Sequence, residues 1–164
     1  MMKCIIKIMN PKSKKLTFDL RSTYLAVIRN SVGTKMFRNS CGRAAGRAVD
    51  LTRGGRLSCA FFVTSVLRIF GLIKEQHTTV GGAVRDLEQS GWRPVKTARP
   101  GDILVWEAVV GQDGNHEHIG FLIAPGVAVS NSTRARLPAE HHWTYGVRAG
   151  KPVRRVMTIY RWNF

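Results

Sequence analysis

The order of the hydrophobic patterns along the chain constrains its fold more than any other feature of the sequence. In the first half, apolar residues recur at helical spacing, most clearly in VTSVLRIF at residues 63–70, with apolar positions at i, i+3, i+4 and i+7. After Pro100 the chain changes to short β-rich runs, namely GDILVWEAVV, HEHIGFLI, GVAVSN and VRRVMTIYRW. Helices followed by strands predict an α+β domain, in which N-terminal helices pack on one side of a C-terminal antiparallel sheet.

Three segments are predicted to be helical. Apolar spacing favours a helix over residues 16–30, and Ser58 is a good N-cap for a second helix that ends near Gly71. A third helix is expected over residues 78–90. The Gly- and Arg-rich residues 31–56 are predicted to form a long irregular connection.

The length of 164 residues fits a single domain, in which we expect residues 1–50 to form a helical N-terminal extension and residues 51–164 to form the core. With 44% hydrophobic and 22% charged residues, the composition is globular, and the chain is long enough to bury a core without disulfides or metals. The three cysteines, Cys4, Cys41 and Cys59, include no CxxC pair, so neither a disulfide framework nor a zinc site is indicated.

The compartment is not fixed by any targeting signal in the sequence. The first residues, MMKCIIKIMNPKSKK, are predicted to form a short strand or tail, and they lack the apolar region and cleavage site of a signal peptide. No apolar run approaches the roughly 20 residues that span a bilayer, so no transmembrane segment is expected. The protein is therefore expected to stay in the cytoplasm or to be exported by a non-standard route.

Cys59 has two interpretations from the residues alone. Cysteine is among the most often buried residue types, and Cys59 lies on the same apolar stripe as Val63, which fits a structural position in a core helix. In the first turn of a helix, however, the helix dipole and free N–H groups favour the nucleophilic thiolate. A nucleophile also needs a base and a third polar group, and we expect His118 and Asn131 to face each other on neighbouring strands.

Four stretches, taken in order, resemble the NlpC-type branch of the papain-like cysteine peptidases, with the CHAP-type amidases as cousins. LSCAFFVTSVL resembles the nucleophile helix of that family, and ARPGDILVW resembles the strand PGDLVFF that precedes the catalytic histidine. HIGFLI resembles the strand HVGIYL that carries the base, and AVSNS resembles the next strand, which carries the third polar residue. The resemblance spans about residues 55–135 and implies the papain-like NlpC-type fold, with residues 51–164 as its catalytic core.

The resemblance also implies a cysteine hydrolase that cleaves an amide bond, expected in peptidoglycan stem peptides, and that needs no metal or organic cofactor. Cys59 carries over as the nucleophile and His118 as the base. Asn131 carries over as the residue that orients the imidazole, with the adjacent Ser130 as the alternative. Ser58 and Cys59 carry over as the N-cap and oxyanion-binding positions, although Ser58 stands where the family usually has an acidic residue.

A second group of polar and aromatic residues follows in LPAEHHWTYG. His142 and Trp143, together with His116, are candidates for one wall of a substrate groove, and the alternative is a packed loop edge with aromatic anchors. His116 and His118 are two residues apart on one predicted strand, so both face the same side. Further zinc ligands would have to come from distant residues, and no metal is expected.

The charge of the chain leaves a function of a different class open. The formal net charge is +16, which points to an anionic partner such as acidic cell-wall polymer, anionic lipid or nucleic acid, or to a basic surface that serves solubility. A peptidoglycan-like substrate fits this charge. The alternative hypothesis is a non-catalytic basic protein of the same fold that binds nucleic acid or anionic wall polymer.

Overall fold

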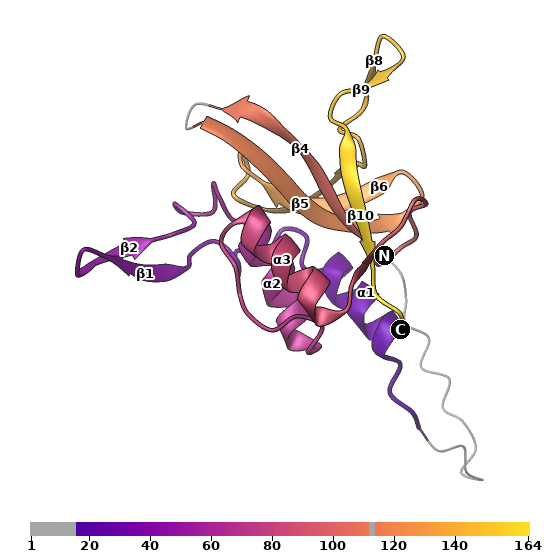
Figure 1. Cartoon of the computed structure of the whole chain (residues 1–164), viewed down its shortest axis with the longest axis horizontal. Helices are drawn as coiled ribbons and strands as arrows, with labels where there is room; N and C mark the ends of the chain where they lie inside the picture. Colours follow the sequence, from indigo (N-terminus) through magenta and orange to yellow (C-terminus); the bar gives the residue numbers. More distant parts are fainter. Residues whose placement is uncertain (1–15, 112–113) are drawn as a thin grey trace.

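The computed structural model describes residues 16–111 and 114–164, and in them three helices precede a six-stranded sheet. The helices are α1 (Leu20–Asn30), α2 (Cys59–Ile69) and α3 (Val80–Ser90). The sheet has the order β3 (Arg93–Pro94), β10 (Val156–Arg161), β4 (Ile103–Gly111), β5 (Gly114–Ala124), β6 (Val127–Ser132), β7 (Leu137–His142). All neighbouring strands are antiparallel, and the helices gather on one side of the sheet (Figure 1). The predicted α+β architecture is confirmed.

Local capping explains where two of the helices begin and end. The carboxylate of Asp19 accepts a hydrogen bond from the Ser22 N–H at 2.9 Å, so α1 begins after Asp19. Thr79 caps α3 in the same way through its hydroxyl, and Gly91 ends that helix with φ 108°. A left-handed conformation favours glycine, because the absent Cβ removes the steric cost.

The main core lies between α2 and the central strands. The side chains of Phe62, Val63, Val66 and Leu67 are fully buried, and α2 packs on β5 and β6. From the sheet, Ile119 joins this core, whereas Leu122 joins a smaller apolar cluster on the opposite face. Because strand side chains alternate between faces, β5 is buried on both sides. Positions 118, 120 and 122 therefore share the sheet face opposite to that of Ile119.

Gly120 allows β5 and β6 to pack closely at this point. Gly120 pairs with Ser130, and a Cβ at position 120 would lie 2.6 Å from the Val129 carbonyl oxygen and 2.7 Å from the Ser130 Cβ. Contacts this short do not fit between packed atoms. Glycine is thus required by close approach of the neighbouring strand and its side chains.

Residues 31–56 contain a hairpin, so the prediction of an irregular connection was wrong in part. β1 (Cys41–Ala44) pairs with β2 (Arg47–Asp50), and the two turn residues between them have positive φ, 48° at Ala45 and 78° at Gly46. Positive φ at both central positions is typical of a tight hairpin turn, which the sequence AAG signals weakly. The hairpin projects away from the helices (Figure 1).

Residues 1–50 were expected to form a helical N-terminal extension, and α1 lies in this part of the chain. In its described part, α1 is helical, but Tyr24 and Ile28 are fully buried in the same core as α2. The first helix is therefore an integral part of the domain. The strand or tail expected at the start of the chain lies outside the described residues.

The described structure also contains strands that the sequence did not predict, among them β7 and a short pair of strands. The stretch LPAEHH forms the edge strand β7, where Pro138 is tolerated because an edge strand need not use every N–H group. A short hairpin of β8 (Val147–Arg148) and β9 (Lys151–Pro152) precedes β10. Among the described residues, no helix has the length and apolar character that crossing a membrane requires.

Candidate active site

The beginning of α2 and the strands β5, β6 and β7 line an open cavity of about 810 Å³. Its polar lining includes Cys59, His118, Ser130, Asn131, His141 and Arg154. The structure therefore brings the predicted nucleophile, base and third residue to one cavity. Of the predicted groove residues, His116 also lines the cavity, whereas His142 and Trp143 do not. Their neighbours His141 and Tyr145 line it instead.

Cys59 is the first residue of α2, and its thiol is partly buried at the cavity wall. The N–H groups of Ala60 and Ile119 are directed at the sulfur and lower the thiol pKa, as does the Arg154 guanidinium. Burial acts in the opposite direction and is the larger effect, so the pKa of the Cys59 thiol is raised. The expectation that the helix start alone would lower this pKa is wrong, because desolvation outweighs the N–H groups.

His118 lies on β5 with 9% of its surface exposed. Its Nε2 is 2.9 Å from the Ser130 hydroxyl oxygen, and its ring packs 5.7 Å from the Trp106 ring. Burial lowers the pKa of His118 to about 3, and the charges of Arg154 and His141 act in the same direction. The imidazole is therefore neutral at physiological pH, which is the form that accepts a proton.

A chain of hydrogen bonds sets which ring nitrogen of His118 carries the proton. His141 Nδ1 lies 2.8 Å from the His142 carbonyl oxygen, which only accepts, so His141 Nδ1 is protonated. In a neutral ring His141 Nε2 then accepts, and it takes the Ser130 hydroxyl proton across 2.8 Å. The Ser130 oxygen in turn accepts from His118 Nε2–H. His118 Nδ1 is left unprotonated and has no hydrogen-bond partner among the described residues.

Tyr145 completes the surroundings of the Ser130 hydroxyl. Its phenolic oxygen lies 3.2 Å from the Ser130 oxygen, and its ring stacks on His141 with centroids 4.1 Å apart. Because the Ser130 proton goes to His141, Tyr145 must donate to Ser130. The hydroxyl thus gives one hydrogen bond and receives two, so its hydrogen-bonding capacity is full.

Asn131 does not contact the imidazole, contrary to the sequence expectation. Ser130 pairs with Gly120, so Ser130 shares the face of His118, and Asn131 points to the opposite face. There its Nδ2 donates to the Gly55 carbonyl oxygen at 2.8 Å. Its Oδ1 is buried and has no hydrogen-bond partner within residues 16–111 and 114–164. Of the two alternatives left open by the sequence, Ser130 is the one that contacts His118.

Ser58 occupies the N-cap position of α2 without capping the helix through its side chain. Its hydroxyl is fully buried and donates to the Phe37 carbonyl oxygen, and it makes no hydrogen bond to the first N–H groups of α2. It does not line the cavity either. The N–H groups at the start of α2 are therefore left without a side-chain cap, and two of them, those of Cys59 and Ala60, are directed at the Cys59 sulfur.

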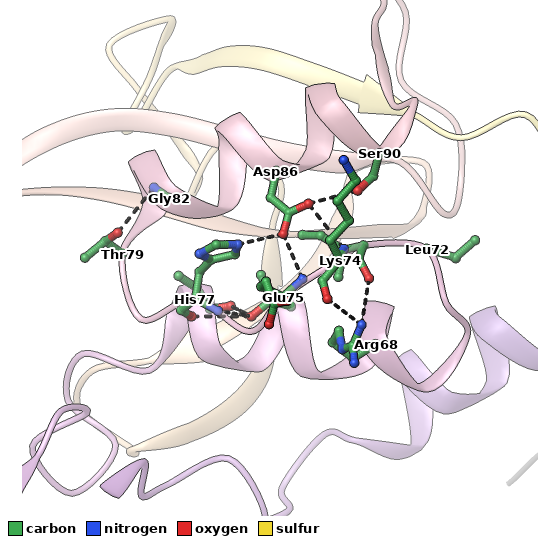
Figure 2. A network of polar contacts seen from close by, with 12 residues as sticks. Arg68, Leu72, Lys74, Glu75, His77, Thr79, Gly82, Asp86 and Ser90 are labelled. Carbon is green, nitrogen blue, oxygen red and sulfur yellow. Dashed lines mark hydrogen bonds and ion pairs between the residues drawn. The ribbon is translucent and has the colours of Figure 1, made fainter. Parts of the chain in front are cut away.

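A polar network fixes residues 74–77 to α3, directly before residues 78–81, which form another wall of the cavity (Figure 2). The Asp86 carboxylate accepts hydrogen bonds from the N–H groups of Lys74 at 3.2 Å and Glu75 at 2.8 Å. It also accepts from the Ser90 hydroxyl at 2.9 Å and contacts His77 Nε2 at 2.8 Å. These contacts lower the pKa of Asp86 to about 2, even though burial opposes them. The segment between α2 and α3 is thereby fixed to α3.

No group of three or more His, Cys, Asp or Glu side chains suited to a metal ion occurs in the described part of the chain. His116, one of the candidate zinc ligands, is partly exposed at the cavity wall.

Fold and cavity together define an α+β protein with a thiol at a helix start and a neutral histidine on the adjacent strand. Neither a scan against protein-family models nor a search of the curated proteins found a match to this chain.

Proposed function

We propose that this protein is a cysteine hydrolase of the papain-like, NlpC-type fold that cleaves an amide bond. The observation that carries the proposal is the direction of the Ile119 N–H, which points at the Cys59 sulfur. Because Ile119 directly follows His118, this contact brings the sulfur next to the strand position that bears the base. The unprotonated Nδ1 of His118 is the nitrogen left to accept the thiol proton.

The reaction starts from a neutral thiol and a neutral imidazole, because burial raises the pKa of Cys59 and lowers that of His118. His118 Nδ1 takes the thiol proton as the sulfur attacks the amide carbonyl carbon. The imidazolium then gives this proton to the leaving amine, and the C–N bond breaks to leave a thioester. Water, deprotonated by the same nitrogen, hydrolyses the thioester and releases the acid and the free thiol.

Ser130 and His141 support the base during these steps. Ser130 keeps the imidazole in the Nε2–H form, and the same hydrogen bond orients the ring when Nδ1 becomes protonated. The uncapped N–H groups at the start of α2 are suited to stabilise the negative charge that develops on the carbonyl oxygen. Asn131 has no role in this scheme, and its amide instead fastens the Gly55 loop to β6.

The proposed substrate is an amide in a peptidoglycan stem peptide or a similar anionic wall component. The sequence resemblance suggests this class, and the net charge of +16 favours an anionic polymer as the surroundings of the scissile bond. No metal or organic cofactor enters the mechanism.

The deciding experiment compares Cys59→Ala with Cys41→Ala in an assay of wall-fragment and peptide hydrolysis. Cys41 is an exposed thiol on the β1–β2 hairpin, so its replacement controls for the loss of a cysteine. We expect Cys59→Ala to abolish hydrolysis and Cys41→Ala to retain it. Unchanged activity in Cys59→Ala would contradict the proposal.

A second candidate function is binding of an anionic polymer without catalysis. It is favoured by the basic β1–β2 hairpin, on which Arg43 and Arg47 are both exposed. Filter binding to DNA, RNA and wall polymer over a salt series tests it, because binding through phosphate contacts weakens steeply with salt. A steep slope on nucleic acid, combined with no Cys59-dependent hydrolysis, would favour this candidate.

A further inference from the structure

His142 accepts hydrogen bonds from every main-chain N–H group of residues 144–146, a segment that follows β7. The N–H groups of Thr144 and Gly146 both donate to the ring nitrogen Nδ1 of His142, each at 3.2 Å. The Tyr145 N–H donates to the His142 carbonyl oxygen at 2.7 Å. The segment is therefore organised around one residue, and this residue does not itself line the cavity.

These contacts fix where the proton of the His142 ring lies. A main-chain N–H group only donates, so a nitrogen that receives two of them accepts and carries no proton of its own. In the neutral ring the proton is then on Nε2. The Thr144 hydroxyl lies 2.9 Å from the same Nδ1 and 2.9 Å from the Gly146 carbonyl oxygen, so it links the two ends of the segment. The single nitrogen Nδ1 is thus the group that holds the segment.

The segment keeps Tyr145 in a conformation that is unfavourable in isolation. Tyr145 has φ 60°, in the left-handed region that residues other than glycine rarely occupy. Such a conformation persists only where the surrounding contacts over-determine it. The N–H groups on both sides of Tyr145 converge on His142 Nδ1, and without the His142 side chain they lose this acceptor.

The position of Tyr145 matters for the proposed base. Its phenolic oxygen lies 3.2 Å from the Ser130 hydroxyl oxygen, and Ser130 in turn contacts His118 Nε2. Burial raises the pKa of Tyr145, so its hydroxyl keeps the proton that it donates to Ser130. The Tyr145 ring also stacks on His141, whose Nδ1 donates to the His142 carbonyl oxygen. His142 therefore acts on this chain of hydrogen bonds through both Tyr145 and His141.

We propose that His142 is a positioning residue, whose unprotonated Nδ1 holds residues 144–146 so that the Tyr145 hydroxyl reaches Ser130 and orients the base. The catalytic meaning of this role rests on the proposed hydrolase function, whereas the ring proton and the segment can be observed without any reaction. A merely structural role is the competing explanation. In that case the loss of His142 changes stability, and any effect on kcat is independent of the Tyr145 hydroxyl.

The first test compares His142→Asn, His142→Gln and His142→Ala in the hydrolysis of a soluble peptide. An asparagine amide oxygen can occupy the place of Nδ1, whereas a glutamine amide reaches the place of Nε2, so asparagine alone retains the acceptor. We expect alanine and glutamine to lower kcat about fivefold with little change in KM, and asparagine to stay within about twofold of the wild type. An equal loss in the asparagine and alanine variants, or an unchanged kcat in the alanine variant, would overturn the proposal.

A double-variant cycle tests whether His142 acts through Tyr145. Tyr145→Phe keeps the ring that stacks on His141 and removes only the hydroxyl that contacts Ser130. If the two residues act in series, His142→Ala should lower kcat no further in the Tyr145→Phe background. Losses that multiply in the double variant would contradict this route.

A measurement on the resting protein needs no substrate. Long-range ¹H–¹⁵N NMR spectra show which nitrogen of an imidazole carries the proton, and His142→Asn identifies the signals of His142. We expect the Nε2–H form in the neutral ring. We also expect the N–H groups of Thr144 and Gly146 to exchange faster in His142→Gln than in His142→Asn. A proton on Nδ1 of the wild type would overturn the proposal.

The failure of this proposal is distinguishable from the failure of the hydrolase function. If the wild type hydrolyses no amide, the hydrolase function is contradicted, while the NMR spectra still decide whether His142 holds the segment. If His142→Ala does not fold, the comparison of His142→Asn with His142→Gln and the ring proton of the wild type still decide.

Discussion

The protonation state of His118 leads to a sharp prediction about stability in mild acid. Its pKa is about 3 in the folded protein, against an ordinary value of 6.5 that applies when the chain unfolds. Between these values the unfolded chain binds a proton that the folded site excludes, so stability is fully present above pH 6.5 and falls as the pH drops. Each pH unit costs about 1.4 kcal/mol, which gives about 3 kcal/mol between pH 6.5 and pH 4.

The assay is urea unfolding of the wild type and His118→Gln at several pH values from 6.5 to 4. The glutamine amide can still donate to Ser130 from the position of the imidazole Nε2, so the variant removes the titration with little change in packing. We expect the wild type to lose about 3 kcal/mol more than the variant across this range. The range stops at pH 4 so that the ionisation of carboxylates contributes little.

His116→Gln is the control, since His116 lies two residues earlier on the same strand but outside the Ser130 network. It should lose stability with pH as the wild type does. If the curves of the wild type and His118→Gln remain parallel to within about 0.5 kcal/mol, His118 is not held neutral by the fold, and the proton assignment in the site is wrong.

Two further predictions concern the groups around the cavity. Ser130→Ala should lower kcat about 100-fold, and His141→Gln about tenfold, both with little change in KM. In the proposed mechanism these side chains orient His118 and do not touch the substrate. A change in KM as large as the change in kcat would contradict this role. Asp86→Ala should lower the free energy of unfolding by about 2–4 kcal/mol, measured by thermal or urea unfolding, because it removes a buried carboxylate that accepts hydrogen bonds from the N–H groups of Lys74 and Glu75. Because the pKa of Asp86 is lowered to about 2, its ionised form stabilises the folded wild type above pH 3.8, and about 2 kcal/mol of this stability is lost as the pH falls to 2. A stability difference between the wild type and Asp86→Ala that stays constant from pH 3.8 to 2 would refute the lowered pKa.

Much of the fold could be predicted because the local signals agree with the final packing. Helical spacing predicted α2 and α3 close to their observed bounds, with Gly91 after the last turn of α3, and alternation predicted the hairpin of β5 and β6. The β1–β2 hairpin was missed because its turn residues, Ala45 and Gly46, are weak signals for positive φ. The strand β7 was missed because Pro138 normally argues against a strand, and only its place at the sheet edge permits it.

The candidate site shows a different limit. Cys59 and His118 were predicted as site residues because a helix start and a strand start are local features, and both line the cavity. The choice between Ser130 and Asn131 depends on the pairing register, and a shift of one residue reverses the face of every side chain. The pKa of Cys59 depends on burial by residues distant in sequence, so the local dipole argument predicted the wrong direction. Asp86 gave no signal, since an acidic residue inside a helix usually faces solvent.

The close contact at Gly120 has a consequence for how such sites are recognised in other sequences. Even one added methyl group at position 120 would push against the Val129 carbonyl and Ser130, so the effect would reach His118 without any change to a reacting group. A histidine followed two residues later by glycine therefore indicates the close packing of two strands. This pair of residues alone does not therefore indicate a reaction, because the proposed mechanism also requires the cysteine at the start of α2.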